Sequence, residues 1–324
     1  MKINNNKIKS LLLLSLLNSV AGKDKKSNNK SEILATNQLP QLATNLTERQ
    51  NNPNPTLIFA GHPILVSEGY NNDGSKKSCT ASFAVLYTNS PDCEFGDDNG
   101  GFITSSLCSP ITDSLGNRVF ARDGSTLLGD MEYMTFGRVS SVINDFDYAY
   151  VSIDTSQNNL TPYTTGLTTN DKTVSELYPV IGTPLPQLGI ICAYGTNSGY
   201  RCGNQVGSDL EITIPDPWNS GSTITFKGLN KVDMGTNGFE SEEDRGGPVY
   251  LVGSSVDKKT VINALGHITW FDNTDPNHKL VYYTPIDKAL SAILENNKCS
   301  YSLLTYSGPT AEEFQAQVEI PPKK

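Results

Sequence analysis

Short apolar or alternating runs recur along the middle of this chain, and clusters of Gly, Asn, Asp and Ser separate them. Successive side chains of a β-strand point to opposite faces of a sheet, so such alternation indicates half-buried strands. The runs lie at 81–87, 101–106, 147–153, 187–194, 210–214, 223–226, 248–253, 260–270 and 279–284. Many short strands at this spacing are typical of a β-sandwich or β-barrel. We therefore expect an all-β fold.

One stretch near the C-terminus has the period of a helix instead. In 284–297 the apolar side chains recur every three or four residues, which places them on one helical face. Thr284 is a suitable N-cap, and Pro285 suits the first helical position. The strands and this helix suffice for one domain of two packed barrels. The Thr/Asn-rich segment 155–173 is the expected connection between them.

Residues 1–21 have the organisation of a secretory signal peptide. A Lys-bearing start precedes an apolar run from Leu11 to Leu17, and small residues follow at Ala21 and Gly22. The run is too short to span a membrane, which takes about 20 apolar residues. No second apolar run follows it. We therefore expect a secreted, extracellular protein with no membrane span; a buried N-terminal helix is the weaker alternative.

Composition divides the remaining chain into three parts. Residues 22–56 are rich in Asn, Lys, Gln and Pro, which predicts a low-complexity leader. The strand and helix patterns predict an ordered domain over 57–298. Residues 299–324 are polar and end in prolines, which predicts a C-terminal tail.

The charge balance limits the kinds of partner. The chain carries a formal net charge of −9, and removal of the signal peptide would make it more acidic. Nucleic-acid binding depends on clustered Lys and Arg, so we expect no nucleic-acid partner. We expect no metal or cofactor, because the histidines are scattered and no cysteine pair has zinc-ligand spacing. Candidate N-glycosylation sequons begin at Asn29, Asn45 and Asn159.

The six cysteines of an exported chain suggest disulfide bonds. Six cysteines allow 15 connectivities, so the count by itself assigns no pair.

Five segments, in the same order along the chain, resemble the chymotrypsin-like serine proteases. They are most similar to the secreted branch that contains streptogrisin and α-lytic protease. The segment 244–248 reads Asp-Arg-Gly-Gly-Pro, which resembles the loop that presents the family's nucleophilic serine. The other matching segments are 79–85 with 101–108, 136–153, 192–203, and 264–270 with 282–290. The resemblance implies a double β-barrel with a C-terminal helix.

The resemblance also implies two of the disulfide bonds. The segments 79–85 and 101–108 look like the strand and histidine segment that one bond joins in the branch, implying Cys79–Cys108. The segment 192–203 resembles a disulfide loop specific to the branch, implying Cys192–Cys202. Cys93 and Cys299 then remain, and counting alone suggests that they pair.

The resemblance places two unsuitable side chains at the catalytic positions. Leu107 stands where the family has its histidine, and Leu has no lone pair to accept a proton. Arg245 stands where the family has its serine, and a guanidinium stays protonated and is no nucleophile. Asp147 matches the family's aspartate, with Asp145 as the alternative register. We expect that neither His267, His278 nor Ser241 rescues the chemistry.

The oxyanion hole and the substrate cleft are altered as well. Glu243 replaces the glycine whose backbone N–H forms part of the hole, although Asp244 is retained. In the strand that binds substrate, the family usually has glycine where this chain continues Thr269-Trp270-Phe271. An aromatic ring in the cleft and a ring that packs elsewhere are equally compatible with this sequence.

The replacement of the histidine leaves Asp147 without its usual partner. We expect the long side chain of Arg245 to extend inward and form a bidentate pair with Asp147. The competing hypothesis directs Arg245 outward, toward Glu240, Glu242 or Glu243 in its own loop, where an exposed pair contributes only about 0–1 kcal/mol.

These observations favour a secreted pseudoprotease that binds proteins and does not cleave them. A protease inhibitor, a protease or a cell-surface protein would be a suitable partner. An enzyme with unconventional catalytic residues is the alternative, and an extracellular structural or adhesion protein on a protease scaffold is a third hypothesis. The fold alone does not choose among them.

Expression of the full chain in a secretory host tests the signal peptide. We expect cleavage after Ala21, so N-terminal sequencing of the exported protein should begin at Gly22. A chain that starts at Gly22 is the control and should stay inside the cell. Exported protein that retains Met1 would contradict the prediction.

Overall fold

The computed structural model describes most of the region between Thr56 and Tyr306. The described ranges are 56–67, 76–88, 93, 100–109, 117–134, 144–153, 158–165, 177–183, 190–216, 221–256 and 259–306. All of them belong to one compact unit, Asn51–Lys324. The expected signal peptide and leader, with Asn29 and Asn45, lie outside the described residues. No helix among these ranges is long and apolar enough to cross a membrane.

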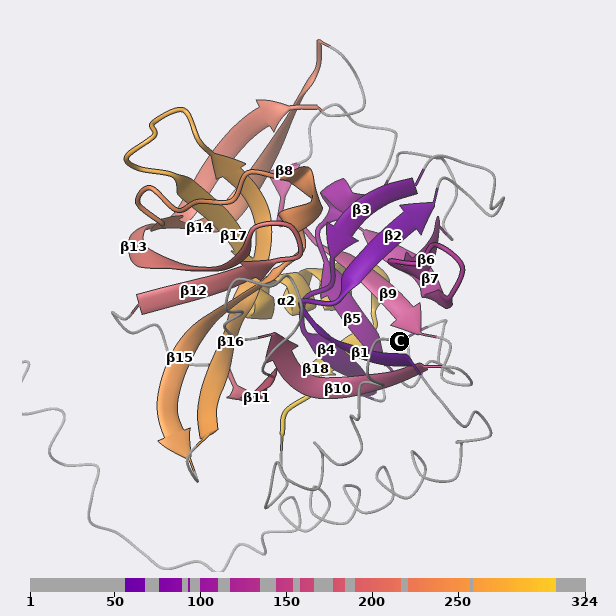
Figure 1. The fold of residues 1–324 in the computed structure, drawn as a ribbon. Coiled ribbons are helices and arrows are strands. Elements are labelled where there is room, and N and C mark those ends of the chain that lie inside the picture. The colour runs from indigo at the N-terminus through magenta and orange to yellow at the C-terminus, as the bar shows by residue number, and fades with distance from the viewer. Residues whose placement is uncertain are drawn as a thin grey trace, which may run out of the picture. The chain divides into compact units, whose positions relative to one another are not determined.

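The first sheet has eight strands in the order β18-β4-β5-β9-β7-β6-β2-β3, and every pairing in it is antiparallel (Figure 1). The strands are β2 (Pro63–Ser67), β3 (Lys76–Thr80), β4 (Ala84–Thr88), β5 (Gly101–Thr104), β6 (Asn117–Ala121), β7 (Leu127–Met134), β9 (Ala149–Ile153) and β18 (Ser300–Leu303). Their alternating apolar side chains fill one core cluster, which includes Ile64, Val66, Phe102, Val119, Leu128 and Val151. Burial of this face stabilises the sheet by roughly 25 cal/mol per Å² of apolar surface.

The second sheet has ten strands and contains a closed barrel. Its strands are β1 (Thr56–Ala60), β8 (Asn144–Asp145), β10 (Asn158–Thr165), β11 (Leu177–Gly182), β12 (Ile190–Gly195), β13 (Gly199–Pro215), β14 (Thr223–Asp233), β15 (Pro248–Val256), β16 (Lys259–Asp272) and β17 (Leu280–Pro285). Strands β16, β15, β12, β13, β14 and β17 pair in turn, and β17 pairs back with β16. This ring leaves no free edge among the six strands.

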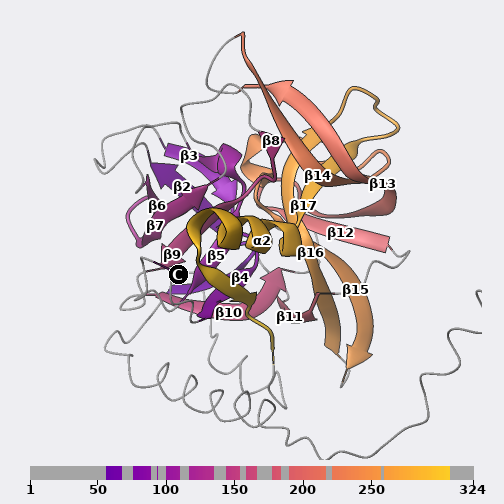
Figure 2. The same cartoon turned by 180° about the vertical axis from the view of Figure 1, so that it is seen from behind.

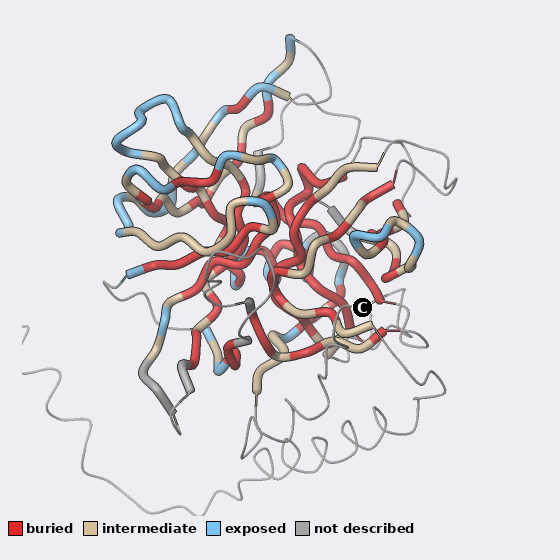
Figure 3. Tube along the Cα trace, in the orientation of Figure 1, coloured by how far each residue is buried: buried red, intermediate tan, exposed pale blue. Residues whose placement is uncertain are grey.

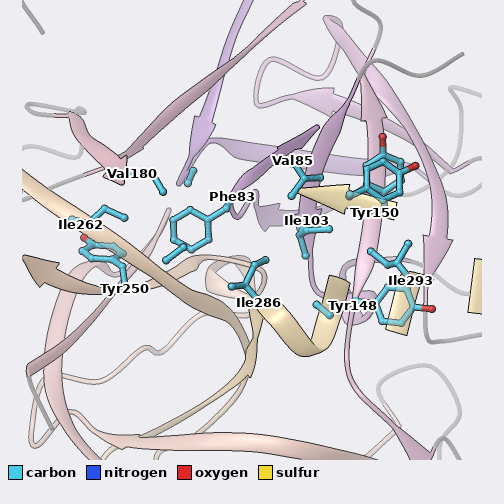
Figure 4. Packing of buried hydrophobic residues seen from close by; sticks show 14 of the residues in the cluster. Phe83, Val85, Ile103, Tyr148, Tyr150, Val180, Tyr250, Ile262, Ile286 and Ile293 are labelled. Atoms are coloured by element: carbon cyan, nitrogen blue, oxygen red, sulfur yellow. The ribbon is translucent and has the colours of Figure 1, made fainter. Parts of the chain in front are cut away.

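The helix α2 (Ile286–Asn297) lies where the two sheets meet (Figure 2). The largest core cluster joins all three elements: Phe83 and Tyr148 come from the first sheet's side, Tyr250 from the second, and Ile286 and Ile293 from α2 (Figure 4). Burial is greatest along this junction, and the exposed residues lie farther out, at turns and along β13 (Figure 3). The all-β fold with a C-terminal helix is confirmed.

Three local expectations need correction. The helix cap is Pro285, not Thr284, because the Thr284 hydroxyl is instead 2.8 Å from that of Thr269. The segment expected to be a connection contains strand β10, which pairs with β1 and β11. The predicted tail starts with β18, which pairs with β4, so the domain continues past residue 298.

The three disulfide bonds are those expected: Cys79–Cys108, Cys192–Cys202 and Cys93–Cys299. Cys93–Cys299 attaches the end of α2 to the loop after β4, which explains why the chain from Cys299 onward returns to the first sheet.

Removal of the disulfides one pair at a time should destabilise the protein in order of loop length. Cys93–Cys299 has a sequence separation of 206, whereas Cys192–Cys202 has one of 10. In the chain-entropy model the losses are about 5 and about 3 kcal/mol. Denaturant unfolding of the paired Cys→Ala variants measures both, and an equal loss would show that chain entropy does not determine the order.

Candidate functional site

The three expected catalytic positions come together where the sheets meet. Two short 3₁₀ helices approach each other there, η1 (Ser106–Cys108) and η2 (Glu242–Asp244). The Arg245 carbonyl accepts a 2.9 Å hydrogen bond from the Thr80 N–H and lies 3.7 Å from the Cys108 sulfur. A disulfide sulfur has no proton to donate, so the second contact is one of packing.

Gly246 explains how closely the two loops approach. Its φ is +80°, and a Cβ on it would lie 2.3 Å from the Thr80 carbonyl oxygen and 2.0 Å from the Thr104 hydroxyl. Only glycine combines this backbone conformation with this contact. The Gly-Gly pair after Arg245 therefore belongs to the contact between the two sheets, which we call the seam.

Leu107 is completely buried at the expected histidine position. It packs in one cluster with Ile214 from β13 and Ile224 and Phe226 from β14. The start of β14 is also joined to the segment before Asp147, because β8 pairs with Thr225 and Phe226 in parallel (Figure 1). The β13–β14 hairpin thus packs on the position from which a catalytic base would act.

Asp147 is completely buried and is surrounded by donors. The Ser105 hydroxyl donates to Oδ2 at 2.7 Å, and the Ser106 N–H donates to Oδ1 at 2.8 Å. The Ser106 hydroxyl donates to Oδ1 as well. Burial by itself raises the pKa of Asp147. The contacts with His267, Ser106 and Ser105 together lower it by more, so the pKa lies below its usual value. The carboxylate is therefore held in its charged form.

Sequence reasoning considered His267 only as a substitute base and missed its contact with Asp147. His267 lies on β16 and is completely buried, with Nε2 3.4 Å from Asp147 Oδ2. No described residue makes an aligned hydrogen bond with either ring nitrogen. A buried carboxylate requires polar neighbours, and this requirement was the available signal. His278, in contrast, is exposed and pairs with Asp233 at 2.7 Å.

The expected pair between Arg245 and Asp147 is wrong. Arg245 Nη2 is 3.2 Å from Glu242 Oε1, and the guanidinium lies over the Trp270 ring at 4.5 Å. The oxygens of Asp147 already have donors from Ser105 and Ser106, so the arginine gains more from an aromatic face. The competing expectation named Glu242 correctly as the partner. It was wrong in directing Arg245 outward, because the arginine side chain is only 2% exposed.

The N–H groups of the expected oxyanion hole are bonded inside their own loop. The Glu243 N–H donates to the Ser241 hydroxyl, and the Arg245 N–H donates to the Glu242 carbonyl, both at 3.2 Å. Ser241 and Asp244 form a capping box that holds η2 in this conformation.

Asp244 attaches η2 to the Cys192–Cys202 hairpin. Its Oδ1 accepts the N–H groups of Asn197 and Ser198 at 2.8 and 3.0 Å. A Cβ on Gly195 would lie 2.3 Å from the same oxygen, so this glycine permits the approach. Asp244 therefore positions the loop, and its role is structural.

The two aromatic residues expected at the cleft lie side by side. Trp270 and Phe271 have ring centroids 6.2 Å apart and an interplanar angle of 16°. Trp270 packs against the Leu107 cluster, and Phe271 packs against the core of the second barrel. Both rings also approach Arg245, at 4.5 and 5.9 Å.

The remaining candidates are briefly placed. Asn159 lies on β10, where it pairs with Leu57 of β1. Within the described ranges, no three His, Cys, Asp or Glu residues are grouped to hold a metal ion.

Comparison with known proteins gave matches in structure only. No family model matches the chain, and no curated protein matches its sequence. Thermobifida fusca Protease A is 19% identical, covering 78% of this chain and 100% of its own, with a TM-score of 0.49. The Nocardiopsis protease is 16% identical, covering 76% and 99%, with a TM-score of 0.48. The chymotrypsin of Cellulomonas bogoriensis is 18% identical, covering 77% and 100%, with a TM-score of 0.47.

The chain's own features define the class of its fold. It has a closed six-strand barrel, a second antiparallel sheet packed against it, and a C-terminal helix at their junction. The Cys79–Cys108 and Cys192–Cys202 bonds are those that the sequence resemblance implied, and Gly246 makes a turn with φ +80°. The protein therefore has a chymotrypsin-like double β-barrel fold.

Two glycine substitutions test the seam between the sheets. Gly246→Ala should cost about 2–5 kcal/mol, because it combines a left-handed residue with overpacking against Thr80 and Thr104. Gly235→Ala is the matched control, since Gly235 has φ +62° and nothing within 4 Å of an added Cβ. It should cost about 1 kcal/mol. Equal losses in urea unfolding would show that the seam tolerates a methyl group.

Proposed function

We propose that this chain is a secreted, non-catalytic homologue of the serine proteases, which acts by binding a protein. The observation that carries the proposal is the burial of both replaced catalytic positions. Leu107 is part of an apolar cluster, and Arg245 is enclosed by Trp270, Phe271 and Glu242. Neither side chain supplies a base or a nucleophile, so the groups that perform acyl transfer are absent from these positions.

The backbone supports the same proposal. Transition-state stabilisation requires N–H groups that point at the developing oxyanion, and loss of one donor costs about 10²–10³ in turnover. Here the N–H groups of Glu243 and Arg245 are bonded to Ser241 and Glu242. A substrate carbonyl would have to break these bonds before it could be stabilised.

The alternative of an unconventional enzyme is disfavoured by the arrangement around His267. A serine nucleophile needs its hydroxyl in contact with a base. Ser105 and Ser106 donate instead to Asp147, which the His267 ring also approaches. All four residues are buried, and no described residue hydrogen-bonds either nitrogen of the imidazole.

Secretion and protein binding are supported less directly. Three disulfides suit an oxidising, extracellular compartment. The fold presents a large surface, and a protease inhibitor, a protease or a cell-surface protein are the partner classes that we propose. The third hypothesis, a structural or adhesive role, assigns no binding function to the region around Arg245. Our proposal assigns one, so this region distinguishes the two.

Activity-based labelling tests the loss of catalysis. The mature protein should show no fluorophosphonate labelling and no ester hydrolysis above buffer, because neither Leu107 nor Arg245 supplies a base or a nucleophile. The double variant Leu107→His/Arg245→Ser should also stay inactive, since the N–H groups of η2 remain bonded internally. Trypsin is the positive control, and circular dichroism confirms folding. Stoichiometric labelling of any serine of the native chain would overturn the proposal.

A further inference from the structure

Arg245 has unused hydrogen-bonding capacity in a buried place. A guanidinium carries five N–H donors, and burial of such donors without acceptors is costly. Only Nη2 has a partner, the Glu242 carboxylate, whereas Nε and Nη1 have none among the described residues. The pKa of Arg245 is lowered by its burial, against the opposing charges of Glu242 and Asp147. The side chain is thus incompletely satisfied where it stands.

The aromatic rings hold the guanidinium without using its donors. Arg245 lies over Trp270 at 4.5 Å and within 5.9 Å of Phe271. An arginine that contacts an aromatic ring through its face keeps its N–H groups in the guanidinium plane for an anion. This is an arrangement suited to a carboxylate, which accepts two parallel hydrogen bonds from one arginine.

Glu242 is an incomplete substitute for such a partner. Its side chain is 60% exposed, and it divides its two oxygens between two cations. Oε1 is 3.2 Å from Arg245 Nη2, and Oε2 is 3.7 Å from Lys77 Nζ. Glu242 opens the 3₁₀ helix η2, whereas Arg245 is the residue that follows this helix, and only Oε1 of Glu242 contacts the guanidinium. One tethered carboxylate therefore serves two cations.

We propose that Arg245, Trp270, Phe271 and Lys77 form a binding site for a carboxylate group of a partner protein, which Glu242 occupies in the free chain. We refer to these four residues as the Arg245 site. The inference rests on the proposed function, since a non-catalytic protein has to recognise its partner by binding alone. The shared chemistry is a carboxylate, either an Asp or Glu side chain or a free C-terminus.

The tether makes Glu242 a competitor of the ligand. A group fixed by a short link acts at an effective concentration of about millimolar, so an incoming carboxylate binds only after Glu242 has moved. Removal of the Glu242 charge should therefore tighten binding, whereas removal of an ordinary surface carboxylate should not. Glu240 provides the comparison, because it lies in the same segment and is similarly exposed, but pairs with Lys279.

The site should also respond to pH through Lys77. Burial, then the charge of Arg245, lowers the pKa of Lys77 to about 8, although Glu242 opposes this. Lys77 is therefore cationic below this value and becomes neutral as the pH rises through it. Among the described residues, Arg245 and Glu242 are the charged groups that act on Lys77. Affinity for a carboxylate should accordingly fall between pH 7 and pH 9.

Binding of defined peptides tests the site. The sequence contains two tryptophans, Trp218 and Trp270, so a Trp218→Phe background makes Trp270 fluorescence a reporter at the site. Three peptides are compared: acetyl-Gly-Ala-Glu-Ala-Gly-amide, the same peptide with Gln for Glu, and the Gln peptide with a free C-terminus. The first and third carry one carboxylate each, from the two possible sources, and the second carries none.

Four variants, all in the Trp218→Phe background, decide the outcome. Glu242→Gln should bind a carboxylate peptide at least 10-fold more tightly than the parent, and Glu240→Gln should stay within 2-fold of it. Arg245→Gln should lose binding, and Arg245→Lys should weaken it strongly, because Lys lacks the planar fork. If Glu242→Gln binds no better than Glu240→Gln, or if the uncharged peptide binds equally well, the inference is wrong.

The same samples separate this inference from the proposed function. Each peptide is recovered after incubation and its mass is measured. Cleaved peptide would overturn the proposed function, because the chain would then be catalytic. Intact peptide that binds no variant at 10 mM would overturn only the carboxylate site and would leave the non-catalytic assignment unaffected.

Discussion

A fully buried carboxylate at the junction of the two sheets determines much of what surrounds it. Asp147 cannot be left without partners there, because an uncompensated buried charge costs several kcal/mol. Ser105 and Ser106 satisfy it from the first sheet, and His267 approaches from the second. Three elements are held to one charged centre in this way. Asp147 therefore needs no pair with Arg245, and the arginine side chain pairs with other neighbours.

The seam has the properties of a protein interior more than those of an active site. Leu107 extends an apolar cluster across the junction, and Gly246 lets the backbone of one sheet touch the other. Active sites keep strained, polar and accessible groups, and their replacement by packed apolar groups commonly favours stability. Leu107 and Gly246 make packed contacts of this kind, so we expect this part of the junction to add to the stability of the fold.

The Arg245 site is a local exception in an acidic chain. The net charge of −9 would repel an acidic partner at long range, whereas Arg245 and Lys77 attract it at short range. Such a site would favour a partner whose carboxylate fits closely over one that is merely acidic. Glu242 adds to this selectivity, because a weak ligand cannot displace it.

How much of this could be read from the sequence depends on the distance over which each cause acts. Alternation and turn residues are local, so they predicted the strands and the C-terminal helix, and the order of the matched segments led to the disulfides. The residues at the expected catalytic positions were visible too, because Leu107 and Arg245 are matters of residue identity. The partner of Arg245 was not, and neither was the place of His267, which is distant in sequence from Asp147. Only the packing of the folded chain brings Trp270, Ser106 and His267 close to these charges. The pairing of each charge therefore depends on neighbours that are far apart in the sequence.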